Sequence, residues 1–420
     1  MPARDRQQAG GGKPGALDWR MILPVFAVVS LVAAGMSSVM PVLPFLVRDM
    51  GGSPTVIGIV IAVEALSQFC SAPLLGQLAD RFGRKRILLA SQILAAASLL
   101  LLAGAPNIAV VVIARLLFGL SAGNLAAAAA YVTEHSDARD RRQAIGIVMG
   151  GVGLGGIVGA GLSGQLSGAS LTTPIHAALL STLLAAVLTF VLLRDSRPAP
   201  HLDTRTGTGA AGGKISLRAL LDTPAVRLLI GVMLCHFFAY GMVISQLPVF
   251  LADTFVWNGH PFGPKELSYL MMADGVVNVL VQIFVLGWLS RHFTERALIV
   301  LIFAVAGAGF LAAGLATTIP VLAFAVVCVG AADALAKPTY LAALSVHVPA
   351  QRQGVVMGSV QALIAVADAA SPVVGGFILG YALYGVWIGV ALAVALAGAV
   401  VTLARLRVDK AGYLTKPGAL

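Results

Sequence analysis

The chain has 420 residues, of which 58% are hydrophobic and only 11% are charged, and its mean hydropathy is +0.92. About a quarter of the residues of a soluble domain are usually charged, so this composition excludes a soluble domain and indicates an integral membrane protein. The net charge of +10 does not indicate a nucleic-acid partner, because the basic residues gather in the tails and in alternate loops between apolar stretches.

Apolar stretches recur along nearly the whole chain. A hydrocarbon core of roughly 30 Å is crossed by about 20 helical residues. Twelve stretches of this kind are predicted, at 22–47, 55–79, 87–105, 108–131, 143–166, 173–193, 225–251, 267–290, 297–316, 320–345, 354–379 and 383–405. We therefore expect an all-α membrane protein with twelve transmembrane helices and no soluble catalytic domain.

The longest polar interruption, at 194–218, is rich in Pro, Gly and Thr and predicts a flexible cytoplasmic linker. We expect it to join two six-helix bundles, an amino-terminal one at 20–193 and a carboxy-terminal one at 219–406. Residues 1–19 are predicted to form a disordered cytoplasmic tail, and residues 407–420 a second cytoplasmic tail.

The two halves repeat short motifs. PVLPFLVRD at 41–49 returns as SQLPVFLAD at 245–253, and GQLADRFGRK at 76–85 returns weakly as GWLSRHFTER at 287–296. A repeat about an axis along the membrane normal is typical of carriers that alternate access and bind their substrate between the halves. The two bundles are therefore expected to be pseudo-symmetric.

The basic residues also predict the orientation of the chain. Nearly all of them fall in the tails and loops of one side, whereas Arg48 and Lys265 fall on the other. By the positive-inside rule both termini are cytoplasmic, and we expect a multi-pass protein of the bacterial inner membrane.

Five ionisable residues lie well inside predicted spans: Glu64, Arg115, Asp274, Asp333 and Asp368. A charged group there costs about 3 kcal/mol on insertion scales, so each is a candidate for proton coupling or for the cavity. Glu64 lies roughly 14 Å deep, near the midplane, where burial disfavours its charged form and makes it a candidate proton carrier. The alternative is a permanently protonated Glu that is hydrogen-bonded to a neighbouring helix.

The other acids fall in the second half. Asp274 lies at nearly the depth of Glu64 in the repeat counterpart of its span, and the two acids could share protons or hold a cationic substrate. Asp333 and Lys337 are four residues apart, on one helix face, and can pair. We expect Lys337 to extend to the cytoplasmic interface, with Asp333 and Asp368 as cavity candidates.

The loop GQLADRFGRKR at 76–86 places an acid among bases. Asp80 ends its span where the start of span 11, near Gln353, should approach in the inward-closed state, and an anion is favourable at a helix start. Gly76 and Gly83 permit close approach and a tight turn. We predict a conformational latch here. The alternative is that the basic residues only set the orientation of the chain in the membrane, but that alternative does not account for Asp80.

This loop resembles the signature loop of the major facilitator superfamily, and IARLLFGLSAG at 113–123 is similar to the Arg motif of its fourth span. The repeat covers essentially the whole chain, which most resembles the twelve-span drug:proton antiporters of that superfamily, including tetracycline exporters. The resemblance implies that Arg115 takes part in proton coupling, and that Arg84 and Arg81 act in the latch, with Arg84 reaching Glu134. The alternative for Arg115 is a purely structural role at the outer face.

GGVGLGGIVGAGLSG at 150–164 allows close helix packing, because small residues let two helices approach. The predicted packing residues are Gly155, Gly159, Gly164, Pro372 and Gly376. The segment resembles the antiporter signature of span 5, except that Ala160 replaces its Pro and Ser163 its Gly. That departure leaves the direction of coupling open.

Val32, Ser98 and Ala306 stand where the resembling tetracycline exporters carry intramembrane acids, so magnesium-chelated tetracycline is not an expected substrate. The histidines lack metal-ligand spacing and are expected in loops or at interfaces: His176, His236, His260 and His347. No metal or cofactor is expected.

The expected function is proton-coupled efflux of small amphipathic compounds by a monomeric secondary transporter, whose partners are its substrate, protons and the lipid bilayer. One alternative is a uniporter or symporter of a small metabolite. Another is a membrane assembly or sensor protein that does not transport. An enzyme is not expected, because no nucleophile, base or metal constellation is present.

Overall fold

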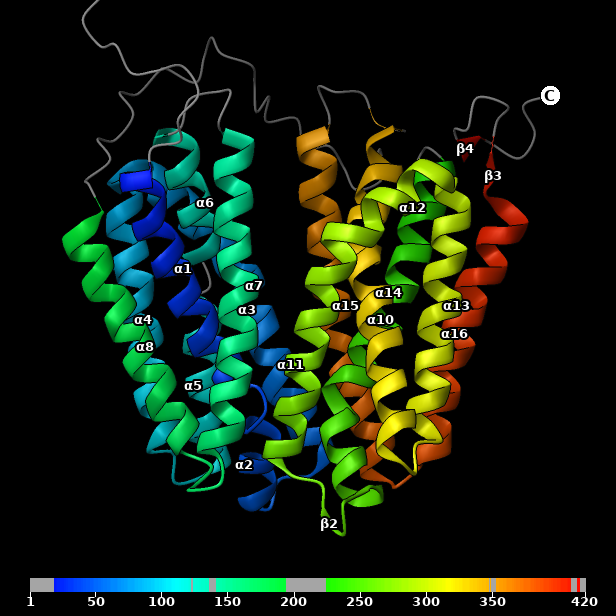
Figure 1. Cartoon of the computed structure of the whole chain (residues 1–420), viewed down its shortest axis with the longest axis horizontal. Coiled ribbons are helices and arrows are strands. Elements are labelled where there is room, and N and C mark those ends of the chain that lie inside the picture. Colours follow the sequence, from blue (N-terminus) through cyan, green and yellow to red (C-terminus); the bar gives the residue numbers. More distant parts are fainter. Residues whose placement is uncertain are drawn as a thin grey trace, which may run out of the picture.

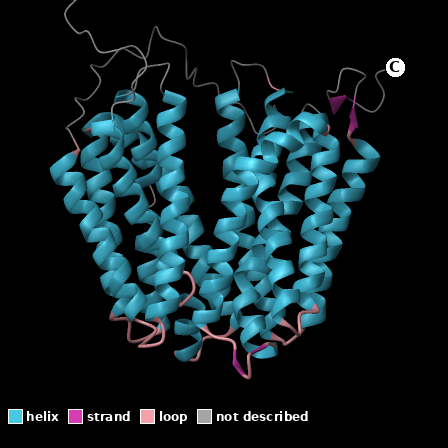
Figure 2. Cartoon of the chain, in the orientation of Figure 1, coloured by secondary structure: helices cyan, strands magenta, loops and turns pink. Residues whose placement is uncertain are grey.

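The computed structural model describes residues 19–121, 124–135, 141–193, 224–346, 348, 353–408 and 414–415. Within these ranges the chain is almost entirely helical, as Figure 2 shows. Eleven of the described helices are long and apolar enough to cross a membrane, and a shorter apolar helix, Ile108–Leu120, accounts for the twelfth span. The all-helical twelve-span prediction is confirmed, whereas the predicted linker at 194–218 lies outside the described residues.

The amino-terminal half packs as one bundle (Figure 1). Its helices are α1 (Trp19–Val39), α2 (Leu43–Asp49), α3 (Pro54–Phe82), α4 (Arg84–Ala103), α5 (Ile108–Leu120), α6 (Asn124–His135), α7 (Arg141–Leu166) and α8 (Thr173–Leu192). Local sequence fixes several ends. The Ser53 hydroxyl caps α3 and the Asn107 amide oxygen caps α5, each accepting from a backbone N–H three residues on. Gly83, at φ +94°, makes the turn between α3 and α4.

The carboxy-terminal half forms the second bundle. Its elements are α10 (Pro224–Thr254), the hairpin β1 (Val256–Trp257) and β2 (His260–Pro261), α11 (Pro264–Leu280), the π-helical turn η1 (Val281–Val285), α12 (Leu286–His292), α13 (Glu295–Gly314), α14 (Ile319–Val346), α15 (Gln353–Gly380) and α16 (Tyr384–Arg405). Short strands β3 (Arg407–Val408) and β4 (Leu414–Thr415) follow. Asn258 and Gly259, both at positive φ, make the hairpin turn that an Asn-Gly pair favours.

Two predicted spans are not continuous α-helices. The span expected at 108–131 is split, because α5 ends at Leu120 and α6 begins at Asn124. At the break the Ser121 hydroxyl donates to the carbonyl oxygen of Phe118 at 2.6 Å, and the Ser121 backbone N–H donates to the same oxygen at 3.0 Å, so both bonds close the last turn of α5. The span expected at 267–290 runs through η1, a wider turn that hydropathy does not reveal.

The two bundles meet at one end and diverge at the other, as Figure 1 shows. We call the end with the Gly83 turn the open end and the end with the Gly51 turn the closed end. At the open end, Gly76 and Gly146 of the first bundle and Gly358 of the second have no described neighbour across the helix surface: a Cβ built on any of them would meet no atom of another described element within 4 Å. Helices α3 and α15 pack closely towards the closed end, where the Thr55 hydroxyl donates to the Gly376 carbonyl oxygen at 3.2 Å.

An ion pair also joins the bundles at the closed end. The Arg48 guanidinium, on α2, lies 2.5 Å from a carboxylate oxygen of Asp253, on α10. The Tyr384 hydroxyl of α16 donates to the other oxygen of that carboxylate at 3.2 Å. These contacts hold the closed end together in this conformation.

Candidate functional site

A cavity of about 420 Å³ lies between the bundles. Its wall is formed by α2 and α3 on one side and by α10, α11, α13, α14 and α15 on the other. Most of the lining is aliphatic, and three carboxylates interrupt it: Glu64, Asp274 and Asp368. The volume lies within the roughly 300–1,000 Å³ typical of small-molecule sites.

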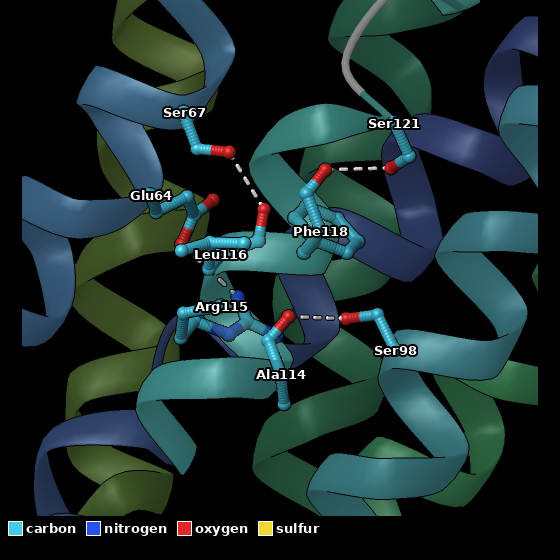
Figure 3. Close-up of polar contacts among 8 residues, drawn as sticks. All are labelled: Glu64, Ser67, Ser98, Ala114, Arg115, Leu116, Phe118 and Ser121. Atoms are coloured by element: carbon cyan, nitrogen blue, oxygen red, sulfur yellow. Dashed lines mark hydrogen bonds and ion pairs between the residues drawn. The ribbon is translucent and has the colours of Figure 1, made fainter. Parts of the chain in front are cut away.

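Glu64 forms a buried ion pair with Arg115, shown in Figure 3. The two residues come from α3 and α5 and are 8% and 1% exposed. Nη1 of Arg115 donates to Oε2 of Glu64 at 3.2 Å, and the guanidinium carbon lies 4.7 Å from the centre of the Phe118 ring. Nε and Nη2 of Arg115 have no hydrogen-bond partner among the described residues. Glu64 is therefore the one carboxylate that balances this guanidinium there.

Serine side chains hold the three helices around this pair. The Ser67 hydroxyl of α3 donates to the Leu116 carbonyl oxygen of α5 at 2.7 Å, and the Ser98 hydroxyl of α4 donates to the Ala114 carbonyl oxygen at 2.7 Å (Figure 3). Ser71, one turn further along α3, donates to the Gly119 carbonyl oxygen at 3.1 Å. Sequence reasoning missed these serines as site residues. Their signal is spacing, since residues 64, 67 and 71 share one helix face.

The second bundle gathers the remaining acids. Asp333 on α14 interacts electrostatically with Asp274 on α11 and Asp368 on α15. The Asp274 carboxylate lies against Gly330, where a side chain would collide with it. Tyr240 of α10 lines the cavity and interacts electrostatically with all three acids. The second bundle thus places three carboxyl groups at or beside one cavity wall.

The possible pairing of Asp333 with Lys337 takes the form of an electrostatic interaction. No ion pair joins them among the described residues, although Lys337 acts electrostatically on both Asp333 and Asp368. The Lys337 side chain is exposed, and this one lysine acts on two of the three acids. The acid group therefore keeps an excess of negative charge when its members are ionised.

The expectation that His236 lies in a loop or at an interface is wrong. His236 lies within α10 and is 2% exposed. Its ring centre lies 5.4 to 6.4 Å from those of four aromatic residues, Phe237, Tyr240, Phe303 and Tyr340. A cage of rings from three helices buries the imidazole, which a single-helix pattern cannot indicate.

The residues of the predicted latch lie at the open end. The Asp80 side chain is 71% exposed, and its carboxylate lies 3.4 Å from the Arg84 guanidinium. The Arg81 guanidinium lies 5.2 Å from the centre of the Phe82 ring. The side chain of Glu134 lies outside the part of the chain that the structure describes. The latch belongs to the conformation in which this end is closed, and it stays a prediction.

The predicted packing residues lie at helix contacts. A side chain on Gly155 or Gly159 of α7 would collide with the backbone of α1, and one on Gly164 would come within 2.9 Å of Ser268 of α11. Gly376 lies against the backbone of Pro54 in α3. The carbonyl oxygen of Pro372 accepts from the Gln246 amide at 3.1 Å and lies where a side chain on Gly58 would be.

Comparison with known families decides what kind of protein carries this site. The family model described as Major Facilitator Superfamily matches residues 25–372 and 259–419. The chain belongs to the Major Facilitator Superfamily. It is therefore a multi-pass membrane transporter and not an enzyme.

Relatives of this transporter include proteins named for drug resistance. It is 30% identical over 371 residues to the class C tetracycline resistance protein of Escherichia coli, covering 84% of this chain and 88% of that protein. It is 31% identical to the class G tetracycline resistance protein of Vibrio anguillarum, covering 86% and 91%. It is 25% identical to the quinolone resistance protein NorA of Staphylococcus aureus, covering 67% and 70%. The resemblance to the drug:proton antiporter branch is confirmed.

Solved structures share the fold of the transporter. A crystal structure of the human organic anion transporter MFSD10 has 21% identity and a TM-score of 0.63, covering 91% of this chain and 99% of that one. A peptide transporter POT in complex with sulfate has 16% identity and a TM-score of 0.73, covering 93% and 94%. At these identities the likeness concerns the fold alone.

Proposed function

We propose that this transporter exports small amphipathic, drug-like compounds in exchange for protons, by alternating access between the two bundles. The observation that carries the proposal is the buried Glu64–Arg115 ion pair at the wall of the cavity between the bundles. The drug-resistance names of its relatives support the substrate class, and the aliphatic lining of the cavity suits an amphipathic molecule.

The open end is the cytoplasmic end in this proposal. Its turns and helix ends carry Arg81, Arg84, Lys85, Arg86, Arg227, Arg291, Arg296 and Arg405, whereas the closed end carries Arg48 and Lys265. Basic residues remain on the cytoplasmic side when a membrane protein inserts. The transporter then lies in the inner membrane of a bacterium with both termini in the cytoplasm, and we propose that it works as a monomer.

Protonation of Glu64 changes the free energy of this conformation enough to shift a conformational equilibrium. A proton on Glu64 removes its charge and leaves the Arg115 guanidinium buried without a counter-charge. Loss of one partner of a buried ion pair costs about 3–5 kcal/mol. A change of about 5.5 kcal/mol converts a 1:99 equilibrium into 99:1. One proton on this pair therefore supplies most of the free energy that switching requires.

The acids of the second bundle complete the cycle. In the conformation with the open end exposed to the cytoplasm, Glu64 is paired with Arg115; in this proposal it has released its proton there, and the substrate enters the cavity. Asp274 and Asp368 line the same cavity and take either protons or the positive charge of a cationic substrate. When the cavity opens to the other side, a proton returns to Glu64 and the substrate leaves.

Proton movement in inside-out vesicles tests the proposal. Respiration acidifies their lumen, a fluorescent amine reports that acidity, and a lipophilic cation dye is then added outside. Antiport predicts that the dye accumulates in the lumen while protons leave, and that an uncoupler abolishes both. Vesicles without the transporter are the control.

The alternatives give different results in the same assay. A symporter, which the Ala160 and Ser163 departures leave open, would acidify the lumen further as substrate enters. A uniporter would move substrate without changing the pH, and a protein that does not transport would move neither. Magnesium–tetracycline is expected to release no protons, because Val32, Ser98 and Ala306 offer no carboxylate to the chelated ion.

A further inference from the structure

A second large groove lies away from the central cavity, between α10 and α16 near the open end. Its volume is about 460 Å³. Both walls belong to the second bundle, and Figure 1 shows α16 at the outer edge of that bundle. The groove therefore moves with one bundle during alternating access, and the transport cycle assigned above does not use it.

Two arginines stand at the end of the groove that is nearest the open end. Arg227 lies in the first turn of α10 and Arg405 is the last residue of α16. Both are exposed, and neither forms a hydrogen bond or an ion pair with any described residue. The Arg296 guanidinium of α13 binds the Leu403 carbonyl oxygen, which adds a third positive charge at the end of α16. None of the described residues that line the groove is acidic.

Beyond the arginines the groove is apolar and runs along the helices into the hydrocarbon. On α10 it passes Gly231 and reaches Cys235, which is eight residues or about 12 Å from Arg227. On α16 it passes Val401 and reaches Ala397, also eight residues from Arg405. A Cβ built on Gly231 would meet no atom of another described element within 4 Å, so among the described residues the space beside it is open.

We propose that this groove binds one anionic phospholipid, with its phosphate between Arg227 and Arg405 and part of an acyl chain beside Gly231. Guanidinium groups bind phosphate oxygens in pairs of hydrogen bonds, and basic pockets between transmembrane helices on the cytoplasmic side suit acidic headgroups. A soluble anion would leave the apolar part of the groove, about 12 Å long, unfilled. The lipid joins the first turn of α10 to the last turn of α16, and so it stabilises the second bundle.

Lipid titration of the purified full-length transporter tests the proposal. Phosphatidylglycerol added to the protein in detergent is expected to raise its melting temperature and to appear as one bound lipid in native mass spectrometry. Phosphatidylcholine with the same acyl chains is expected to do neither. Inorganic phosphate is expected not to displace the lipid, because the apolar chain contributes to binding.

Variants locate the effect in the groove. The double variant Arg227→Gln/Arg405→Gln is expected to bind phosphatidylglycerol at least tenfold more weakly. The matched control Arg86→Gln/Arg291→Gln removes the same charge from exposed positions at the same end and is expected to bind as the wild type does. Gly231→Leu is expected to fold, because its side chain enters open space, and to lose the lipid.

Several results would overturn the proposal. They are equal binding of phosphatidylcholine, full displacement by inorganic phosphate, and unchanged binding in the arginine variant or in Gly231→Leu. An equal loss of phosphatidylglycerol binding in the control double variant would show that general surface charge, and not the groove, causes the effect. Lipid binding is measured without transport, so failure of proton exchange in vesicles would leave this inference standing.

Discussion

Glu64 and Arg115 differ in how each can adapt when its partner is removed. A buried Glu that loses Arg115 can take up a proton and become neutral, whereas a guanidinium stays charged at any accessible pH. The pair is nearly fully buried, so solvent cannot compensate for the missing charge. The arginine is therefore the fixed charge of the site and the glutamate is the group that can change.

This difference predicts an asymmetric effect on stability. Glu64→Gln is expected to lower the free energy of unfolding by about 3–5 kcal/mol, because it leaves Arg115 without a counter-charge. Arg115→Gln is expected to cost less, because a carboxyl group can become neutral whereas a guanidinium cannot. The double variant is expected to recover most of the loss, because both charges are gone.

Thermal unfolding of the purified variants in one detergent, between pH 6 and pH 9, measures this. If Arg115→Gln were the less stable of the two single variants at pH 6, or if the double variant showed the sum of both losses, the two side chains would not act as a pair.

At this scale the sequence indicated the residues but not their partners. Glu64 and Arg115 each stand out as charges in apolar spans. Depth does not say which way a side chain points, so their contact depends on the rotation of α3 against α5. The burial of His236 depends on rings from α13 and α14 and could not be read from α10 alone.

Glycines determine how closely particular helices approach. Gly159 lies against the backbone of Ala34 in α1, and its carbonyl oxygen accepts from the Ser38 hydroxyl at 3.0 Å. A Cβ built on Gly150, on the same helix α7, would meet no atom of another described element within 4 Å. One helix therefore contains a glycine that is needed for packing and another that is not.

Leucine substitutions separate these two positions. Gly159→Leu is expected to lower the melting temperature strongly, because overpacking costs about 1–3 kcal/mol or more and α1 cannot move without losing other contacts. Gly150→Leu is expected to be neutral or stabilising, since leucine favours a helix over glycine by about 1 kcal/mol. Melting curves of the two variants in the same detergent measure the difference, and equal melting temperatures would contradict the packing role of Gly159.

The elements themselves were predictable because hydropathy alone marks a transmembrane helix. The break after Leu120 and the π-helical turn at 281–285 were not, because both leave the apolar composition unchanged. Contacts between spans were indicated only where small residues cluster, as in α7.

The whole molecule is asymmetric along the membrane normal, although its halves are repeated. At the closed end the Arg48–Asp253 ion pair and the α3–α15 contact join the bundles. At the open end Gly76, Gly146 and Gly358, which could allow equivalent contacts, have no neighbours across the gap among the described residues. The repeat in the sequence predicted two bundles, but it could not indicate which end is closed, because both conformations use the same chain.

Alternating access requires that proton binding changes the balance between these two arrangements. Glu64 lies at the wall between the bundles, where a lost charge affects both the pair with Arg115 and the cavity. If this residue couples protons to switching and does not bind the substrate, its neutral variant should still exchange substrate across the membrane. It should fail only to accumulate substrate when a proton gradient is the driving force.

Transport by Glu64→Gln in proteoliposomes tests this claim most directly, with the exposed Asp49→Asn as a matched control. We expect the Glu64 variant still to exchange labelled for unlabelled substrate, more slowly than the wild type because its conformational equilibrium is biased, and to show no accumulation driven by a proton gradient, while the control does both. Accumulation at the wild-type level in Glu64→Gln, or the loss of exchange together with accumulation, would contradict the account.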